Sequence, residues 1–168
     1  MARYRGWEPS EADFDEAREF FEAHLVDPLS LMGMFRAAVY SVLTARERTT
    51  TVEITHSKLM DSDLVTPRKI AAAKKEDVEK IIGYVTLSRQ KIEKVHRLAE
   101  WWQDSDVPTS ILRDALDTRE LEFRLRDELG KRSPYGAPGM AHKCASLFMN
   151  MCGYERVVSV DLWALRYL

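Results

Sequence analysis

Residues 137–153 read APGMAHKCASLFMNMCG, a compact loop that runs directly into an apolar segment with helical spacing. Residues 118–129 just upstream also have helical spacing, and Gly130 follows them. Glycine is common directly after a helix, because it adopts the left-handed conformation that ends many helices. Gly153 marks the end of the second segment in the same way. The pattern predicts a helical hairpin at about 118–152, in which a short loop joins two helices.

Helices are also expected along most of the chain before this hairpin. Residues 29–45 are almost continuously apolar, as in a helix that is buried on all sides. Thr66-Pro67 is typical of a helix start, because threonine caps the first N–H groups and proline fits the first helical position. Helical spacing is also found at residues 13–25, 49–60, 77–82 and 88–102 and after Asp161, and only residues 156–160 resemble a strand. The chain is therefore predicted to be all-α.

The composition fits a compact protein, since 45% of its 168 residues are hydrophobic. The longest apolar run is residues 31–40, but Arg36 interrupts it and no run reaches the length of a membrane span. The N-terminus, from Met1 to Arg5, lacks the apolar core of a signal peptide. We therefore expect a cytoplasmic protein with no membrane partner.

The two cysteines, Cys144 and Cys152, are eight residues apart in one expected helix. At ~1.5 Å of rise per residue their Cα atoms lie about 12 Å apart, which is too far for a disulfide. Two thiols also cannot form a four-cysteine zinc or iron–sulfur site. We expect both cysteines to be small core residues, and we expect no metal and no cofactor.

The net charge of −2 is unevenly distributed. Residues 1–30 hold three arginines against eight acidic residues, whereas residues 131–168 hold five lysines and arginines against two acidic residues. A basic end on a near-neutral protein can form a phosphate-binding face. An ordinary mixed surface explains the same counts, so charge alone leaves both interpretations open.

The hairpin and the residues after it resemble the helix-hairpin-helix (HhH-GPD) DNA glycosylase superfamily. The resemblance is carried by Pro138 to Ala145, Asn150, Gly153-Tyr154 and Val160-Asp161. The family hairpin reads Gly-hydrophobic-Gly, then one residue, then a catalytic lysine. In the family a catalytic aspartate follows this lysine by eighteen residues, and Lys143 and Asp161 have the same separation. The similarity covers roughly residues 28–168. Among relatives, the chain looks nearest to the small 8-oxoguanine DNA glycosylase/AP lyases without an iron–sulfur cluster.

This resemblance implies that Lys143 and Asp161 are the catalytic pair of a base-excision-repair enzyme. Its partner would be double-stranded DNA that holds a damaged base, most directly an oxidised purine, or an abasic site. Lys143 lies in the first turn of its expected helix, where the helix dipole disfavours a positive charge, and a neutral amine can attack the deoxyribose and form a Schiff base. The aspartate would stabilise the charged sugar or take a proton. Considered singly, Lys143 also fits a surface lysine and Asp161 a helix N-cap.

The resemblance also implies a set of DNA contacts. A hairpin loop aims backbone N–H groups at one point, where a phosphate binds without sequence readout, and the residues expected there are Gly139, Met140, Ala141 and His142. Tyr84, with Val85 and Leu87 nearby, lies where relatives carry a wedge that enters DNA, and Arg46 lies where relatives fill the gap left by a flipped base. The plain alternative for each is a turn packed on the core or a surface side chain.

The sequence also departs from the family pattern. Ala141 replaces the second hairpin glycine, and we expect it to need only a helical backbone. Leu162-Trp163 replaces the usual Arg-His pair, which leaves the damage specificity open. The chain stops at Leu168, seven residues into the last expected helix.

The expected division of the chain follows from that end point. Residues 29–168 would form a helix-hairpin-helix glycosylase core that lacks the usual C-terminal helices, and residues 1–28 would add an acidic helix to a second lobe. An incomplete second lobe would favour self-association. The alternative function is a non-catalytic helix-hairpin-helix DNA-binding module.

Overall fold

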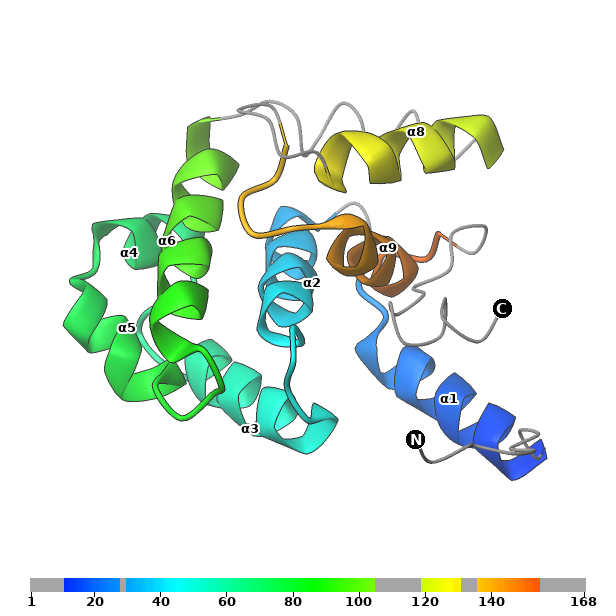
Figure 1. Ribbon diagram of the computed structural model, residues 1–168, viewed down its shortest axis with the longest axis horizontal. Coiled ribbons are helices and arrows are strands. Elements are labelled where there is room, and N and C mark those ends of the chain that lie inside the picture. The colour runs from blue at the N-terminus through cyan, green and yellow to red at the C-terminus, as the bar shows by residue number, and fades with distance from the viewer. Residues whose placement is uncertain (1–10, 28–29, 105–118, 131–135, 155–168) are drawn as a thin grey trace, which may run out of the picture.

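The computed structural model describes residues 11–27, 30–104, 119–130 and 136–154, and within these ranges the regular structure is entirely helical (Figure 1). The helices are α1 (Glu11–His24), α2 (Leu31–Leu43), α3 (Thr49–Met60), α4 (Pro67–Ala72), α5 (Lys75–Ile82), α6 (Ser88–Asp104), α8 (Arg119–Gly130) and α9 (His142–Met151). The predicted all-α class is confirmed for these residues. The strand expected at 156–160 and the helix expected after Asp161 lie outside the described residues.

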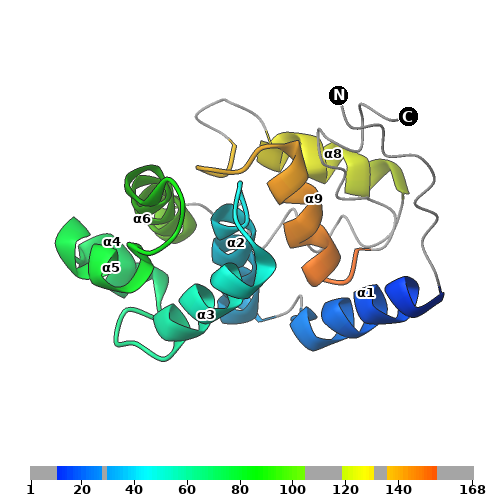
Figure 2. The same ribbon diagram turned by 60° about the horizontal axis from the view of Figure 1, so that its bottom comes forward.

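Helix α2 occupies the middle of the molecule, with α3–α6 on one side and α1, α8 and α9 on the other (Figures 1 and 2). Ser30 caps its N-terminus, because the Ser30 hydroxyl accepts a hydrogen bond from the N–H of Gly33 at 3.1 Å. Every residue of α2 from Met34 to Leu43 except Arg36 is buried. The near-continuous apolar run in the sequence therefore corresponds to a helix that is covered on almost all sides.

An aromatic contact links the two sides of the molecule through α2. The ring of Trp102 on α6 lies 5.5 Å from the ring of Phe35 on α2 and 6.3 Å from the ring of Phe148 on α9, in edge-to-face geometries. Trp101 lies beside Trp102, with ring centroids 6.0 Å apart. Both tryptophans pack against the core. One continuous core therefore joins both groups of helices.

Two predicted helix boundaries are confirmed together with their physical cause. Thr66 accepts a hydrogen bond from the N–H of Lys69 at 3.2 Å, and Pro67 is the first residue of α4. At the end of α9 the chain turns left-handed at Gly153, with φ +84°. The N–H of Gly153 donates to the carbonyl of Asn150 and the N–H of Tyr154 to that of Met149, each at 3.0 Å, which is a Schellman motif.

Both cysteines are free thiols buried in α9, as predicted. Burial raises the pKa of the Cys152 thiol to about 12 and also raises the pKa of Cys144.

A membrane crossing would need a longer and more apolar helix than any within the described residues.

Candidate functional site

Helices α8 and α9 pack against each other and form the hairpin that the sequence predicts. Gly130 makes this approach possible, because a Cβ at this position would lie only 2.4 Å from the His142 ring. Two backbone hydrogen bonds hold residues 136–141, the described part of the chain before α9: the N–H of Ala137 donates to the carbonyl of Leu129 and the N–H of Met140 to the carbonyl of Ala137, each at 3.1 Å. These residues therefore hold a defined conformation at the start of α9.

The hairpin loop is pressed against α6 at Gly139. This residue has φ +83°, a left-handed conformation that favours glycine. A Cβ at Gly139 would lie 2.8 Å from the Cβ of Lys94 on α6. The sequence predicted a DNA contact at Gly139, and in the structure the atoms nearest to a Cβ at this position belong to a lysine side chain of the protein itself.

The backbone at Ala141 differs from the prediction. We expected a helical backbone here, but Ala141 is extended, with φ −109° and ψ 175°. The reason is that α9 begins one residue later, at His142, and a residue at the N-cap lies outside the helical region. Alanine adopts this extended conformation without strain. Its methyl group cannot accept a hydrogen bond, so Ala141 provides no side-chain cap for the first N–H groups of α9.

The other hairpin residues have distinct environments. Lys143 is the second residue of α9 and is partly buried, so the prediction that it lies in the first turn is confirmed. His142 is mostly exposed, and its Nε2 lies 4.0 Å from Oδ1 of Asp127 on α8. Met140 is only 6% exposed and its N–H bonds within the loop. Met140 is therefore a core residue that anchors the loop.

Three lysines lie within electrostatic reach of one buried thiol at this end of α9. Burial raises the pKa of Cys144, and the backbone of Ala141 and the charges of Lys143, Lys94 and Lys91 oppose that rise. The α9 N-terminus and α6 thus gather positive charge beside the hairpin loop. Asp161, the predicted partner of Lys143, lies outside the described residues, so their pairing stays a prediction.

A second group of predicted contact residues lies on two loops next to α6. Arg46 belongs to the α2–α3 loop (residues 44–48) and is exposed, with φ +56°. Tyr84 belongs to the α5–α6 loop (residues 83–87) and is 79% exposed. The ammonium of Lys58 lies 5.2 Å from the centre of the Tyr84 ring.

The two neighbours of Tyr84 that were considered for the wedge have different environments. Val85 is only 4% exposed and belongs to the interior. Leu87 is 42% exposed and has φ +58°, which is unusual for a residue other than glycine. Of the three residues considered for a wedge, Tyr84 and Leu87 are therefore accessible and Val85 is not.

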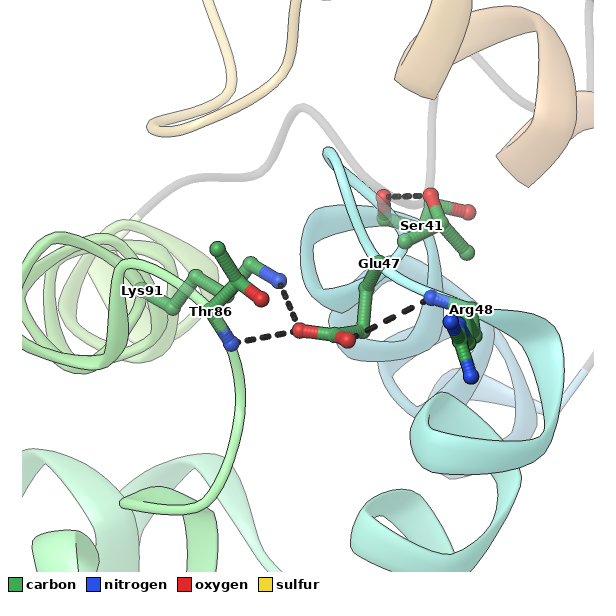
Figure 3. A network of polar contacts seen from close by, with 6 residues as sticks. Ser41, Glu47, Arg48, Thr86 and Lys91 are labelled. Atoms are coloured by element: carbon green, nitrogen blue, oxygen red, sulfur yellow. Dashed lines mark hydrogen bonds and ion pairs between the residues drawn. The ribbon is translucent and has the colours of Figure 1, made fainter.

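Glu47 connects these two loops (Figure 3). Its Oε2 accepts a hydrogen bond from the backbone N–H of Thr86 and lies 3.4 Å from the ammonium of Lys91 on α6, while its Oε1 accepts from the N–H of Arg48 at 3.3 Å. The side chains of Glu47 and Lys91 are only 8% and 2% exposed.

The surroundings lower the pKa of both members of this pair. Burial acts to raise the pKa of Glu47, but the N–H groups of Thr86 and Arg48 and the charge of Lys91 outweigh it, so that the pKa is lowered. Burial lowers the pKa of Lys91, and Glu47 opposes this effect.

The sequence prediction missed Glu47, Lys91 and Lys94. A signal for Lys91 was present, because it is spaced from Val95, Leu98 and Trp102 as a residue on the apolar face of α6. A lysine on such a face is buried only when it has a partner. The partner itself, 44 residues away, leaves no local signal in the sequence.

Comparisons with protein-family models and with curated proteins give no match for this chain.

Proposed function

We propose that this chain is a helix-hairpin-helix DNA glycosylase/AP lyase of base-excision repair, acting on double-stranded DNA that holds an oxidised purine or an abasic site. The observation that carries the proposal is the hairpin: a left-handed turn at Gly139 leads into a helix whose second residue is the partly buried Lys143. The eighteen-residue spacing from Lys143 to Asp161 supports it further. Lys143 is the nucleophile and Asp161 assists it.

In the proposed reaction, the amine of Lys143 forms a bond to C1′ of the damaged nucleotide while the bond from C1′ to the base breaks. The base departs with the bonding electrons and takes up a proton. Opening of the sugar ring gives a Schiff base between Lys143 and C1′. Loss of a proton from C2′ then expels the 3′ phosphate, and water hydrolyses the Schiff base and releases the lysine. The Asp161 carboxylate stabilises the positive charge that develops on the sugar.

The DNA backbone is bound at the α9 N-terminus. The first N–H groups of a helix and the positive end of its dipole favour a phosphate, and Lys94 lies against the loop that precedes them. Arg46 and Tyr84 are both exposed and lie on adjacent loops. An aromatic ring and a guanidinium are suited to stack on and hydrogen-bond to bases exposed when a nucleotide leaves the duplex.

Trapping of the covalent intermediate tests this function. Borohydride reduces a Schiff base to a stable amine, so the full chain incubated with a duplex that holds 8-oxoguanine or an abasic site should give a cross-linked species. Lys143→Gln should abolish the adduct. Lys80→Gln, which removes an exposed lysine of α5, is the matched control and should keep it. An adduct of unchanged yield in Lys143→Gln would remove this lysine from the mechanism.

A non-catalytic DNA-binding module is the second candidate. It is favoured by the position of Lys94 against the hairpin loop, because a helix N-terminus and a lysine can both attract a phosphate without any contribution from Asp161. This candidate predicts salt-sensitive binding to all duplexes with no trapped species, and a Lys143→Gln variant that loses affinity about equally for each sequence.

A further inference from the structure

We infer that Glu47 is a positioning residue that holds the α2–α3 loop and the α5–α6 loop as one unit, and thereby presents Arg46 and Tyr84 together to a damaged base pair. The inference rests on the proposed function. It concerns how the protein distinguishes damaged DNA from intact DNA. The chemistry of base removal is assigned to Lys143 and Asp161.

The geometry of Glu47 carries this inference. Each carboxylate oxygen accepts a backbone N–H from a different loop, Oε1 from Arg48 and Oε2 from Thr86, and Oε2 also faces the Lys91 ammonium. These residues directly adjoin the predicted DNA contacts, since Arg46 precedes Glu47 and Tyr84 lies two positions before Thr86. Movement of one loop without the other would break the hydrogen bond between Glu47 and Thr86.

The burial of the pair argues for a role beyond stability. Taking two charges out of water is costly, and a buried ion pair is often no more stabilising than apolar residues of the same volume. The chain also carries an ion pair between Lys75 on α5 and Glu93 on α6, and both of those side chains are about half exposed. An exposed pair would therefore suffice to link neighbouring segments, whereas the Glu47 pair is enclosed.

Backbone strain on both sides of the network supports the same role. Arg46 and Leu87 adopt left-handed conformations with φ of +56° and +58°. A side chain disfavours this conformation, and such residues persist where the surroundings over-determine them, often at functional sites. Arg46 lies directly before Glu47, and Leu87 lies directly after Thr86. The hydrogen bonds of Glu47 therefore help to hold both loops in conformations that an unconstrained chain would not keep.

This arrangement fits the recognition of a damaged base pair. A nucleotide leaves the duplex readily only when the protein fills the space left behind and pairs the exposed groups. Two side chains on independent loops would have to be ordered separately upon binding, whereas loops joined in advance avoid that cost. Loss of the connection should therefore weaken binding to a site that lacks a base more than binding to intact DNA.

The test compares the affinity of the full chain for a duplex with a tetrahydrofuran abasic analogue and for the same duplex intact. The variant Glu47→Leu/Lys91→Met removes both charges, so that neither remains buried without a partner. Its preference for the abasic duplex should fall by about tenfold or more, the loss expected when a base–aromatic stack is disengaged. The matched control Glu93→Leu/Lys75→Met removes the exposed pair and should keep the preference.

The ratio of the two affinities separates positioning from folding, because any inactive fraction lowers both apparent affinities equally. Glu47→Gln, which keeps one acceptor oxygen, provides a second variant and should show an intermediate loss. If the wild-type chain prefers the abasic duplex and both Glu47 variants retain that preference, the inference is overturned while the proposed function stands. If the wild-type chain binds the two duplexes equally, the proposed lesion recognition fails and the inference with it.

Discussion

Gly139 and Lys94 lie so close together that a Cβ on the glycine would approach the Cβ of Lys94 to 2.8 Å. The hairpin loop and α6 are therefore in contact a few residues before Lys143, and the glycine is required by both its left-handed φ and its surroundings. Gly153 at the other end of α9 has nearly the same φ, but its Cβ would meet nothing within 4 Å. The two glycines thus separate the effect of conformation from the effect of crowding.

Gly139→Ala should lower the free energy of unfolding more than Gly153→Ala. The shared left-handed conformation costs about 1–2 kcal/mol for alanine, and the contact with Lys94 adds about 1–3 kcal/mol of overpacking at Gly139 alone. Urea unfolding of both variants measures the difference. Equal losses would mean that the loop moves away from α6 without cost. Gly139→Ala should also lower the yield of trapped adduct, which Gly153→Ala should leave near the wild-type level.

Acidification should destabilise the fold through His56. Burial lowers its pKa to about 4, and the charges of His24 and Arg36 act in the same direction, while a hydrogen bond of 3.1 Å from its Nε2 to the Arg36 carbonyl opposes them. The rings of His56 and Tyr40 also form a T-shaped pair, with centroids 5.3 Å apart. Because the folded pKa lies below the unfolded value, the stabilising contribution is complete above about pH 6.5 and is lost as the pH falls toward 4.

The size of this effect is about 3 kcal/mol, since one pKa unit corresponds to about 1.4 kcal/mol. The free energy of unfolding, measured by urea titration at several pH values, should decline over that window. His56→Gln keeps a donor for the Arg36 carbonyl and does not titrate, so its decline should be shallower. Burial also lowers the pKa of His96, so the His56→Gln variant should still show some decline. Parallel curves for the wild type and His56→Gln would contradict the prediction.

Removal of one charge should affect the two ion pairs very differently. Glu47→Gln leaves the buried Lys91 ammonium without a counter-charge and should cost about 3–5 kcal/mol of stability. Glu93→Gln removes one member of the exposed pair with Lys75 and should cost about 0–1 kcal/mol. Chemical denaturation of both variants gives the comparison. A similar small loss in each would indicate that Lys91 reaches solvent when Glu47 is neutral.

Tyr84→Ala should leave the fold almost intact and still impair DNA binding. The ring is 79% exposed and the Lys58 ammonium lies over it, so the loss of stability should stay within about 1 kcal/mol. Binding to an abasic duplex should weaken about tenfold, as expected for the loss of one stacking contact. Fluorescence anisotropy measures the affinity, and a thermal melt checks the fold. An unchanged affinity would show that Tyr84 does not enter the DNA.

The sequence predicted the local structure well because the responsible interactions are short-range. The bounds of α3 match the predicted 49–60, and Thr66 and Gly153 mark helix ends through bonds to residues three to five positions away. The start of α9 was less accurate. Ala141 is extended, and Met140 is turned into the core, because contacts of the loop with α8 and α6 determine their positions.

The candidate site was predicted only in part. Spacing and resemblance singled out Lys143, whose place in the first turn of α9 depends on local sequence. The Glu47–Lys91 pair depends on how the α2–α3 loop meets α6, and a single sequence does not encode that distance in any periodic pattern. The role of Asp161 and the glycosylase assignment stay predictions.

The burial of α2 against α9 has a consequence for the nascent chain. About a hundred residues separate the end of α2 from the end of α9, and translation at the usual rate needs on the order of 10 s to make them. During that interval α2, the most apolar of the described helices, has left the ribosome without α9, one of the helices that cover it. A newly made chain should therefore depend on chaperones that shield exposed apolar helices, and slow synthesis of its last third should increase aggregation.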